Sequence, residues 1–231
     1  MRVHAPLRVG RRLRTAGLTK RTPRPAPPHM TSPIRFPVST LRRVVAVLAI
    51  LSASAATAHP HVWITYTAKI RMRGATISGI TENWRFTEGF PVMLVGIDHL
   101  PTDGPVGPAQ TGIFRQQAFS SLAPADYFNH LLVDGESQHF AEPSDFSVSV
   151  KNGRIEYTFT LRLVKPVAVA GRRVQLGVWD ESFYVDYEPG TDAAVSLDSG
   201  AAPTCRIRTF ADQRHPIFYG TVVPQATAIT C

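Results

Sequence analysis

Alternation of apolar and polar side chains is the clearest pattern in this chain, and it begins at Val62. Apolar side chains occupy the even positions from Val62 to Met72, and mostly polar side chains occupy the odd ones. A period of two is typical of a strand with one buried face. The turn Arg73-Gly74-Ala75 and the run from Thr76 to Phe86 then predict a second strand, and with it a hairpin.

The same alternation returns in the second half of the chain. Asn152-Gly153, a dipeptide typical of tight hairpin turns, separates the alternating runs 146–150 and 155–163. Further strands are predicted over 173–179, 183–187 and 194–197. The acidic residues that follow Trp179 are interpreted as water-facing groups of a β-hairpin. The three tryptophans, Trp63, Trp84 and Trp179, are candidate core anchors of the fold.

The middle of the chain has a different character. Glycines and prolines recur from Gly89 to Pro108 and predict a long loop. Helical spacing favours one helix from Ala109 to Leu122 and a second, short helix from Pro124 to Leu132, which the turn Asp134-Gly135 closes. We therefore expect a mainly β chain, an antiparallel β-sandwich with a helical and loop insertion at about residues 89–133.

The first 58 residues have the three parts of a secretory signal. Arg42-Arg43 provide positive charge, 44–51 are uniformly apolar, and Ala56-Thr57-Ala58 is a small-x-small site at which Ala56 and Ala58 would direct cleavage. The apolar run is too short to span a bilayer. Met30 is the more ordinary start, with an upstream extension before it. The sequence thus predicts export to the periplasm and one domain over 59–231.

Removal of this leader reverses the charge of the protein. The whole chain has 25 Lys and Arg against 17 Asp and Glu, a net charge of +8. Residues 1–58 contain 11 of these basic residues and no acidic ones, so 59–231 carry 14 against 17, a net charge of −3. The basic excess belongs to the leader, and a nucleic-acid partner is therefore not expected. No further segment after Ala58 is long and apolar enough to span a membrane.

Cleavage after Ala58 would create a chelating amino terminus. His59 would then offer an amine and an imidazole together, and His61 a second imidazole, which suits Ni, Co, Zn or Cu. Pro60 has no N–H, so chelation through deprotonated backbone amides is excluded. His99, in the long loop, is a candidate further ligand. Alternatively, His-Pro-His is only an extended lead-in to the first strand. No spacing links the amino terminus to the other candidates, which are His130, His139, His215, Asp180 and Asp186.

The two cysteines and the absence of known catalytic motifs limit the kinds of reaction that we expect of this protein. Cys205 and Cys231 are expected to form a disulfide in an oxidising compartment, although ligation of a metal by thiolates is the alternative. The chain has no nucleophile elbow, no Cys-His pair and no phosphate-cradling glycine loop. We therefore expect a binding protein and not an enzyme.

Several motifs together carry a resemblance to a known family. They are His59-Pro60-His61-Val62-Trp63-Ile64, Trp84-Arg85-Phe86 with Phe90, Tyr127-Phe128 before Asp134-Gly135, the Asn152-Gly153 hairpin, and Trp179-Asp180 before Phe183-Tyr184-Val185-Asp186-Tyr187. On these the chain resembles exported bacterial proteins of unknown function, described as the periplasmic component of an uncharacterised ABC-type transport system. The resemblance implies a companion of a nickel, cobalt or zinc transport system.

Three functions follow from these observations. The leading hypothesis is an exported accessory protein that binds a transition metal at its amino terminus and exchanges it with a membrane transporter. The second is a structural accessory that binds no metal and docks on a permease through the loop from Gly89 to Pro108. The third is a copper enzyme in which the amine and imidazoles brace the metal for oxidative chemistry.

Overall fold

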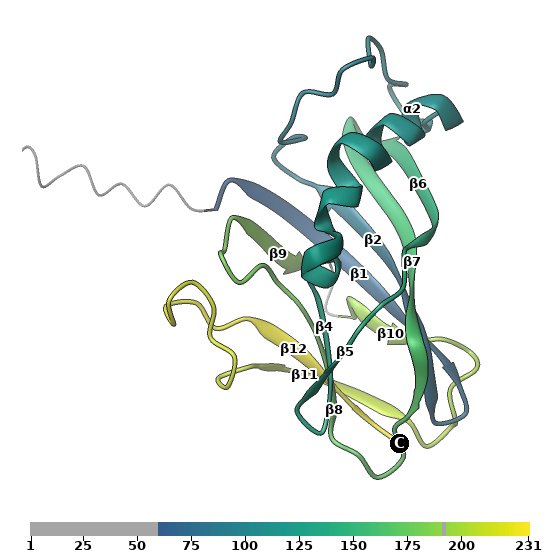
Figure 1. The fold of residues 1–231 in the computed structure, drawn as a ribbon, viewed down its shortest axis with the longest axis vertical. Coiled ribbons are helices and arrows are strands. Elements are labelled where there is room, and N and C mark those ends of the chain that lie inside the picture. Colours follow the sequence, from purple (N-terminus) through teal and green to yellow (C-terminus); the bar gives the residue numbers. More distant parts are fainter. Residues whose placement is uncertain (1–59, 191–192) are drawn as a thin grey trace, which may run out of the picture. The chain divides into compact units, whose positions relative to one another are not determined.

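A computed structural model describes residues 60–190 and 193–231, which form one compact unit (Figure 1). The predicted leader, with Met30, Ala56 and Ala58, lies outside the described residues, and so does His59, which follows it. The described part is mainly β, with two sheets and a helical insertion. The predicted class, a β-sandwich with a helical insertion, is confirmed.

The first sheet is built on the two predicted hairpins. Its strands are β1 (Val62–Arg73), β2 (Thr76–Phe86), β3 (Gly104–Pro105), β6 (Ser144–Lys151), β7 (Arg154–Ala168), β9 (Val185–Pro189) and β10 (Val195–Leu197). They follow the order β10-β1-β2-β7-β6-β3, and β9 pairs with β1 outside this path. The even positions of β1 are buried, as its alternation predicts. Asn152 and Gly153 have φ of 51° and 71°, the left-handed conformation that a tight hairpin needs.

The second sheet contains five strands in the order β11-β12-β8-β4-β5. They are β4 (Asn129–Val133), β5 (Glu136–Gln138), β8 (Val174–Val178), β11 (Arg206–Ala211) and β12 (Gln225–Thr230). The sequence analysis did not predict β11 and β12. Both faces of β12 are partly buried and carry small or polar side chains such as Ala226 and Thr227, so an alternating pattern is weak there.

The helical insertion differs from its prediction. It consists of α2 (Pro108–Phe114), a π-helical turn η1 (Arg115–Phe119) and a 3-10 segment η2 (Ser120–Phe128). The second helix predicted from Pro124 to Leu132 is wrong. Backbone φ is positive from Asp126 to Phe128, which ends helical geometry, and the next residues form β4 between β8 and β5. His130 therefore lies in a strand.

The hairpin predicted after Trp179 is also wrong. β8 belongs to the second sheet, whereas β9 pairs parallel to β1 in the first, so the chain crosses between sheets at Trp179–Tyr184. β10 also pairs parallel to β1. The sandwich is thus not purely antiparallel. Parallel neighbours need a crossover connection, and no local turn signal announces one.

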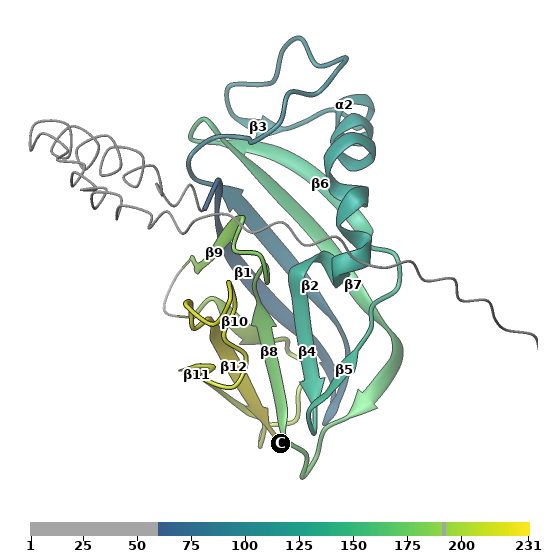
Figure 2. The same ribbon diagram turned by 60° about the vertical axis from the view of Figure 1, so that its left-hand side comes forward.

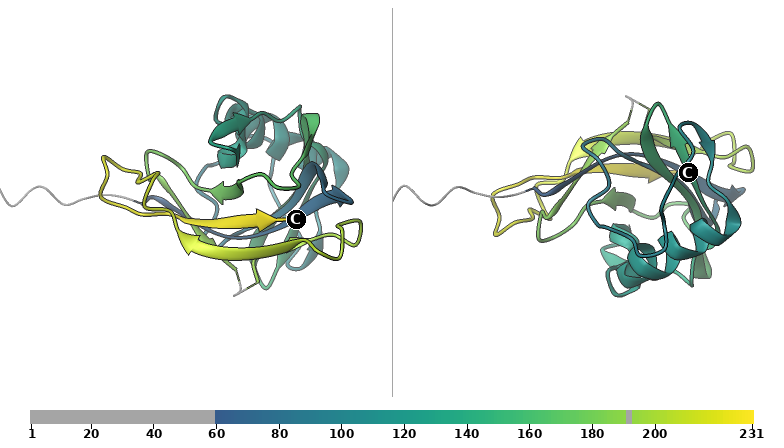
Figure 3. Two further views of the ribbon diagram at one scale, coloured as in Figure 1. Left: turned by 90° about the horizontal axis from the view of Figure 1, so that it is seen from below. Right: turned by 90° about the horizontal axis from the view of Figure 1, so that it is seen from above.

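A single face of the first sheet is covered by two different layers (Figures 2 and 3). The second sheet packs over one part of it, and Leu131 and Leu176 share a core cluster with Ile70 and Ile80. The helical segment covers the other part, where the Phe119 ring lies 4.8 Å from that of Phe159, centroid to centroid. In residues 60–190 and 193–231, no helix is long and apolar enough to cross a membrane.

Candidate functional site

The start of β1 fixes the chain that follows the predicted cleavage site. The backbone N–H groups of His61 and Val62 both donate to the carbonyl oxygen of Tyr184, at 2.9 and 3.2 Å. The His61 side chain is exposed, and its ring lies 4.9 Å from the Tyr184 ring. His61 is therefore held at the start of β1, at one end of the sheet, with its imidazole on the surface.

The outer face of β1 and β9 continues from His61. Trp63 is paired with Asp186 in the parallel register, and its side chain is 36 % exposed. Trp63 is thus not the core anchor that the sequence suggested, unlike Trp84, which is 1 % exposed. Burial, and secondarily the charge of Glu188, raises the pKa of Asp186. This outer face therefore carries the His61 imidazole and the Trp63 indole on β1, and the Asp186 carboxyl group beside the indole on β9.

His99 is not brought to this face by any contact in the structure. It lies exposed in the long loop, and its backbone carbonyl accepts a hydrogen bond from the Gln110 side chain. Within the described ranges, no group of three or more His, Cys, Asp or Glu side chains is placed to hold a metal ion. His59, the main predicted ligand, lies outside those ranges.

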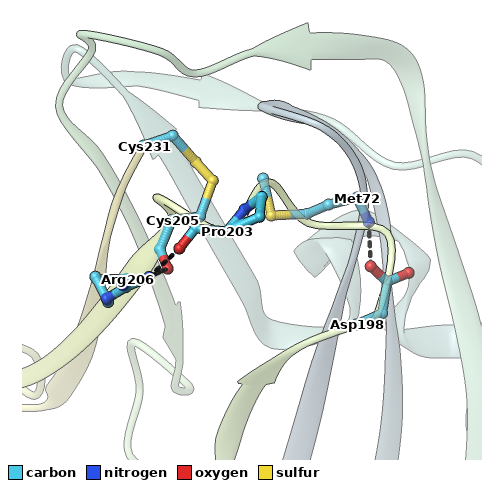
Figure 4. The surroundings of a disulfide bond; sticks show 6 residues. All are labelled: Met72, Asp198, Pro203, Cys205, Arg206 and Cys231. Carbon is cyan, nitrogen blue, oxygen red and sulfur yellow. Dashed lines mark hydrogen bonds between the residues drawn. A yellow bond between two sulfur atoms is a disulfide. The ribbon is translucent and has the colours of Figure 1, made fainter.

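Cys205 and Cys231 are joined in a disulfide, with their Cα atoms 4.0 Å apart (Figure 4). The bond links the residue before β11 to the residue after β12, two strands that pair along their length. The Arg206 guanidinium donates to the carbonyl oxygens of Pro203 and Cys205 beside it. With both sulfur atoms in the bond, neither serves as a thiolate ligand in this form.

A cavity of about 510 Å³ opens beside the start of β1, between the first sheet, β9 and the helical segment. Its walls are mainly aromatic and aliphatic and include Val62, Trp84, Ala118 and Tyr187. Its size and lining are typical of a small-molecule site. The sequence analysis missed this cavity, because its walls come from segments far apart in the chain.

Asp180 is the one carboxyl among the described residues of the cavity wall. Its oxygens accept hydrogen bonds from the Ser182 hydroxyl and from the backbone N–H groups of Ser182, Tyr184 and Val185. Asp180 is only 8 % exposed. These donors hold a buried negative charge at the cavity and also shape the crossover from β8 to β9.

Glu82 lies behind this wall in the core between the layers and is 1 % exposed. Trp84 donates its indole N–H to one carboxyl oxygen, and the other oxygen has no partner in the described structure. Burial raises the pKa of Glu82 to about 8, although the Trp84 indole N–H and the nearby Asn129 side chain act in the opposite direction. The sequence contained a signal for it, because Glu82 falls on the apolar face of its strand between Ile80 and Trp84.

The outer face of the second sheet carries another polar group of side chains. The Trp179 indole stacks on the His130 ring at 4.4 Å and more loosely on the His215 ring at 6.3 Å. Nδ1 of His215 lies 2.7 Å from a carboxyl oxygen of Asp212, within hydrogen-bond distance. The structure thus brings together His130 and His215, which the sequence analysis weighed separately.

Gly177 makes this stacking possible. A Cβ atom at this position would lie 1.7 Å from the Trp179 ring, so the indole folds directly over the Gly177 backbone. Burial lowers the pKa of His130, and its Nε2 lies 2.9 Å from the Trp179 carbonyl oxygen. His139 lies near the same region, paired with Asp126 at 2.9 Å. His130 is thus a packed side chain, whereas His139 and His215 are each paired with a carboxyl group.

Comparison with known families gives one match. The model of a family described as "Protein of unknown function (DUF1007)" matches residues 44–216. The match includes the helical insertion, the cavity wall and His61. No curated protein matches the chain.

Proposed function

The chain belongs to this family of uncharacterised proteins, and we propose that it is an exported binding protein that captures a divalent transition metal at its mature amino terminus. It would act in the periplasm as the accessory of a membrane transporter. The observation that carries the proposal is the position of His61, exposed at the start of β1 and fixed there by a backbone hydrogen bond.

The local geometry supports a compact metal site. Alternate residues of an extended chain point to the same side, at most about 7 Å apart along the backbone, so the proposal requires an extended His59-Pro60-His61 segment that presents both imidazoles together. Asp186 lies on the outward face of β9, beside Trp63. Its carboxyl group is two residues along the chain from Tyr184, whose carbonyl oxygen accepts the His61 backbone N–H, and a mixed nitrogen and oxygen set suits Ni, Co, Zn or Cu.

The transporter partner is supported by the resemblance of the motifs at the start of β1 and around Trp179 to periplasmic transport components. That support is associational. A function in transport would require the metal to be released, and an exposed site with few protein ligands is suited to exchange.

The test begins with the mature protein. Mass spectrometry should find His59 as the first residue, and titration with Ni, Co, Zn and Cu should give one strong site. His59→Ala and His61→Ala should each weaken binding at least about tenfold, as should one extra residue before His59, since each removes a ligand. His139→Ala, which alters an exposed histidine paired with Asp126, is the matched control. Equal affinity in the extended form would refute the role of the amine.

A second candidate function is a structural accessory that docks on a permease without binding metal. The long loop favours it, because Met93 is 98 % exposed and Val95 81 % exposed. Apolar side chains so exposed are typical of contact surfaces. Met93→Ser with Val95→Ser should abolish co-purification with the transporter if the loop docks there, and should leave metal affinity unchanged. Redox cycling by the copper-loaded protein would instead support the copper enzyme.

A further inference from the structure

We propose that the cavity beside β1 binds a small organic cation of the alkylammonium class. The first argument is the chemistry of the wall. Seven of its eighteen lining residues are aromatic, among them Trp84, Phe128 and Tyr157. Aromatic rings attract a cation through their negative faces, and the attraction strengthens where water is excluded. Alkylammonium groups also have an apolar surface that such walls can cover.

The second argument is the sign of the charge. Of the described residues that line the cavity, none is Lys, Arg or His, and the one ionisable acid is Asp180. Asp180 is held by hydroxyl and backbone donors, and no ion pair in the described part of the chain neutralises it. A buried negative charge at a low-dielectric wall favours a cation and repels an anion.

A second carboxyl lies directly behind the wall. Glu82 accepts the indole N–H of Trp84, a wall residue, so its carboxyl group is separated from the cavity by one ring. Glu82 also forms no ion pair in the described residues. A cation in the cavity would stabilise the ionised form of Glu82, so binding should be accompanied by release of a proton from it.

Polar side chains from four elements surround Glu82, and its neighbour on β7 is the apolar Phe159. They are Tyr66 on β1, Trp84 on its own strand, Tyr187 on β9 and Asn129 on β4. Burial raises the pKa of both tyrosines well above the neutral range, so they stay protonated and uncharged. No basic group is among them, and Glu82 is the group in this cluster that can respond to pH between 6.5 and 9.

Three soluble probes of matched shape test the charge preference. They are choline, its neutral isostere 3,3-dimethylbutan-1-ol, and the anion 3,3-dimethylbutanoate, titrated calorimetrically into the purified protein. Choline should bind at least about tenfold more tightly than the alcohol, and the anion should not bind. Equal binding of choline and the alcohol, binding of the anion, or no binding of choline overturns the proposal.

Variants locate the site and separate it from the amino terminus. Ala118→Phe places a ring in the cavity and should abolish choline binding, whereas Ala211→Phe, at an exposed alanine of β11, should leave it unchanged. His59→Ala should also leave it unchanged, so that failure of the metal proposal and failure of this one are distinguishable. Choline binding that survives Ala118→Phe overturns the assignment to this cavity.

Glu82→Gln tests the second carboxyl. In the unaltered protein, choline affinity should rise between pH 6.5 and 9 as Glu82 ionises more easily, and in Glu82→Gln it should be flat over this range. An equal rise in both proteins overturns the role of Glu82. Should Glu82→Gln fail to fold, calorimetry in buffers of different ionisation enthalpy measures the protons released when choline binds to the unaltered protein. Binding without proton release then overturns the role of Glu82.

Discussion

Glu82 shows how one side chain can couple the interior of this fold to pH. It is buried between the two layers beside Trp84 and Asn129, with one oxygen unpaired in the described structure. A carboxyl group in such surroundings is stabilised in its protonated form, because the charged form would lose its hydration. Near neutral pH the folded protein therefore holds one proton at Glu82 that the unfolded chain has already released.

The stability of the fold should accordingly depend on the ionisation of Glu82. Its pKa rises from 4.5 to about 8 on folding, so its stabilising contribution is complete below pH 4.5 and is lost as pH rises through 8. The free energy of unfolding should fall with a slope approaching about 1.4 kcal/mol per pH unit between these values. Urea unfolding of Glu82→Gln should lack this slope. The exposed-acid control Glu136→Gln should keep it, and a slope that persists in Glu82→Gln would refute the assignment.

Gly177 is a second residue whose role depends on its neighbours. Because the Trp179 indole lies over its backbone, Gly177→Ala should displace the ring from His130 and destabilise the fold by about 1–3 kcal/mol. The matched control is Gly112→Ala in α2, where a Cβ meets no atom within 4 Å. This control should stabilise by about 0.5–1 kcal/mol, since alanine favours helix. Equal melting temperatures for the two variants would contradict this role of Gly177.

Among the elements, β11 and β12 depend most on a covalent link. They form one end of the second sheet, and only β12 pairs with β8. The disulfide from Cys205 to Cys231 closes a loop with a sequence separation of 26 across this pair. It reduces the conformational freedom of the unfolded chain and so stabilises a ribbon whose own core is small.

Removal of both sulfur atoms should measure this contribution. Cys205→Ser with Cys231→Ser should lower the free energy of unfolding by about 3.5 kcal/mol, from the entropy of closing a loop of this length. Urea unfolding with and without reductant provides the measurement. Reductant should destabilise the unaltered protein by a similar amount and leave the double variant unchanged. Equal stability with and without reductant in both proteins would show that the link does not support the sheet.

For the molecule as a whole, export should change the sign of the charge. The full chain has a net charge of +8, and loss of residues 1–58 would leave −3. The exported protein should therefore bind to an anion exchanger at pH 8, and the precursor to a cation exchanger. Mass spectrometry of each fraction identifies the form. A form that begins at His59 but binds to the cation exchanger would contradict the predicted reversal of charge.

The sequence predicted the elements whose pattern is local. The alternation in β1, β2, β6 and β7 located four strands, and Asn152-Gly153 located one hairpin, because side-chain period and turn conformation depend on neighbouring residues. β4 was predicted as a helix because its leucines also suit helical spacing. The segment is a strand because it pairs with β8 and β5, and these pairings give its buried backbone N–H and C=O groups their hydrogen-bond partners.

Some of the candidate sites could likewise be recognised from the sequence, and others required the structure. The amino-terminal histidines, Pro60 and the two cysteines could be recognised from residue type and order alone, and they carry the metal proposal and the disulfide. The cavity, the charge of Asp180 at its wall and the burial of Glu82 required the folded chain.

The sequence by itself thus determined the strands of the two main hairpins, and it is the source of the leader prediction and of the metal hypothesis at His59 and His61. Only the tertiary structure decided that β9 and β10 lie parallel to β1, that the chain crosses between sheets after Trp179, and that a carboxyl group is enclosed in the core. The physical reason is the separation along the chain over which each effect acts. Local patterns set the conformation of each segment, whereas strand order and burial depend on apolar contacts between segments that are far apart in the sequence.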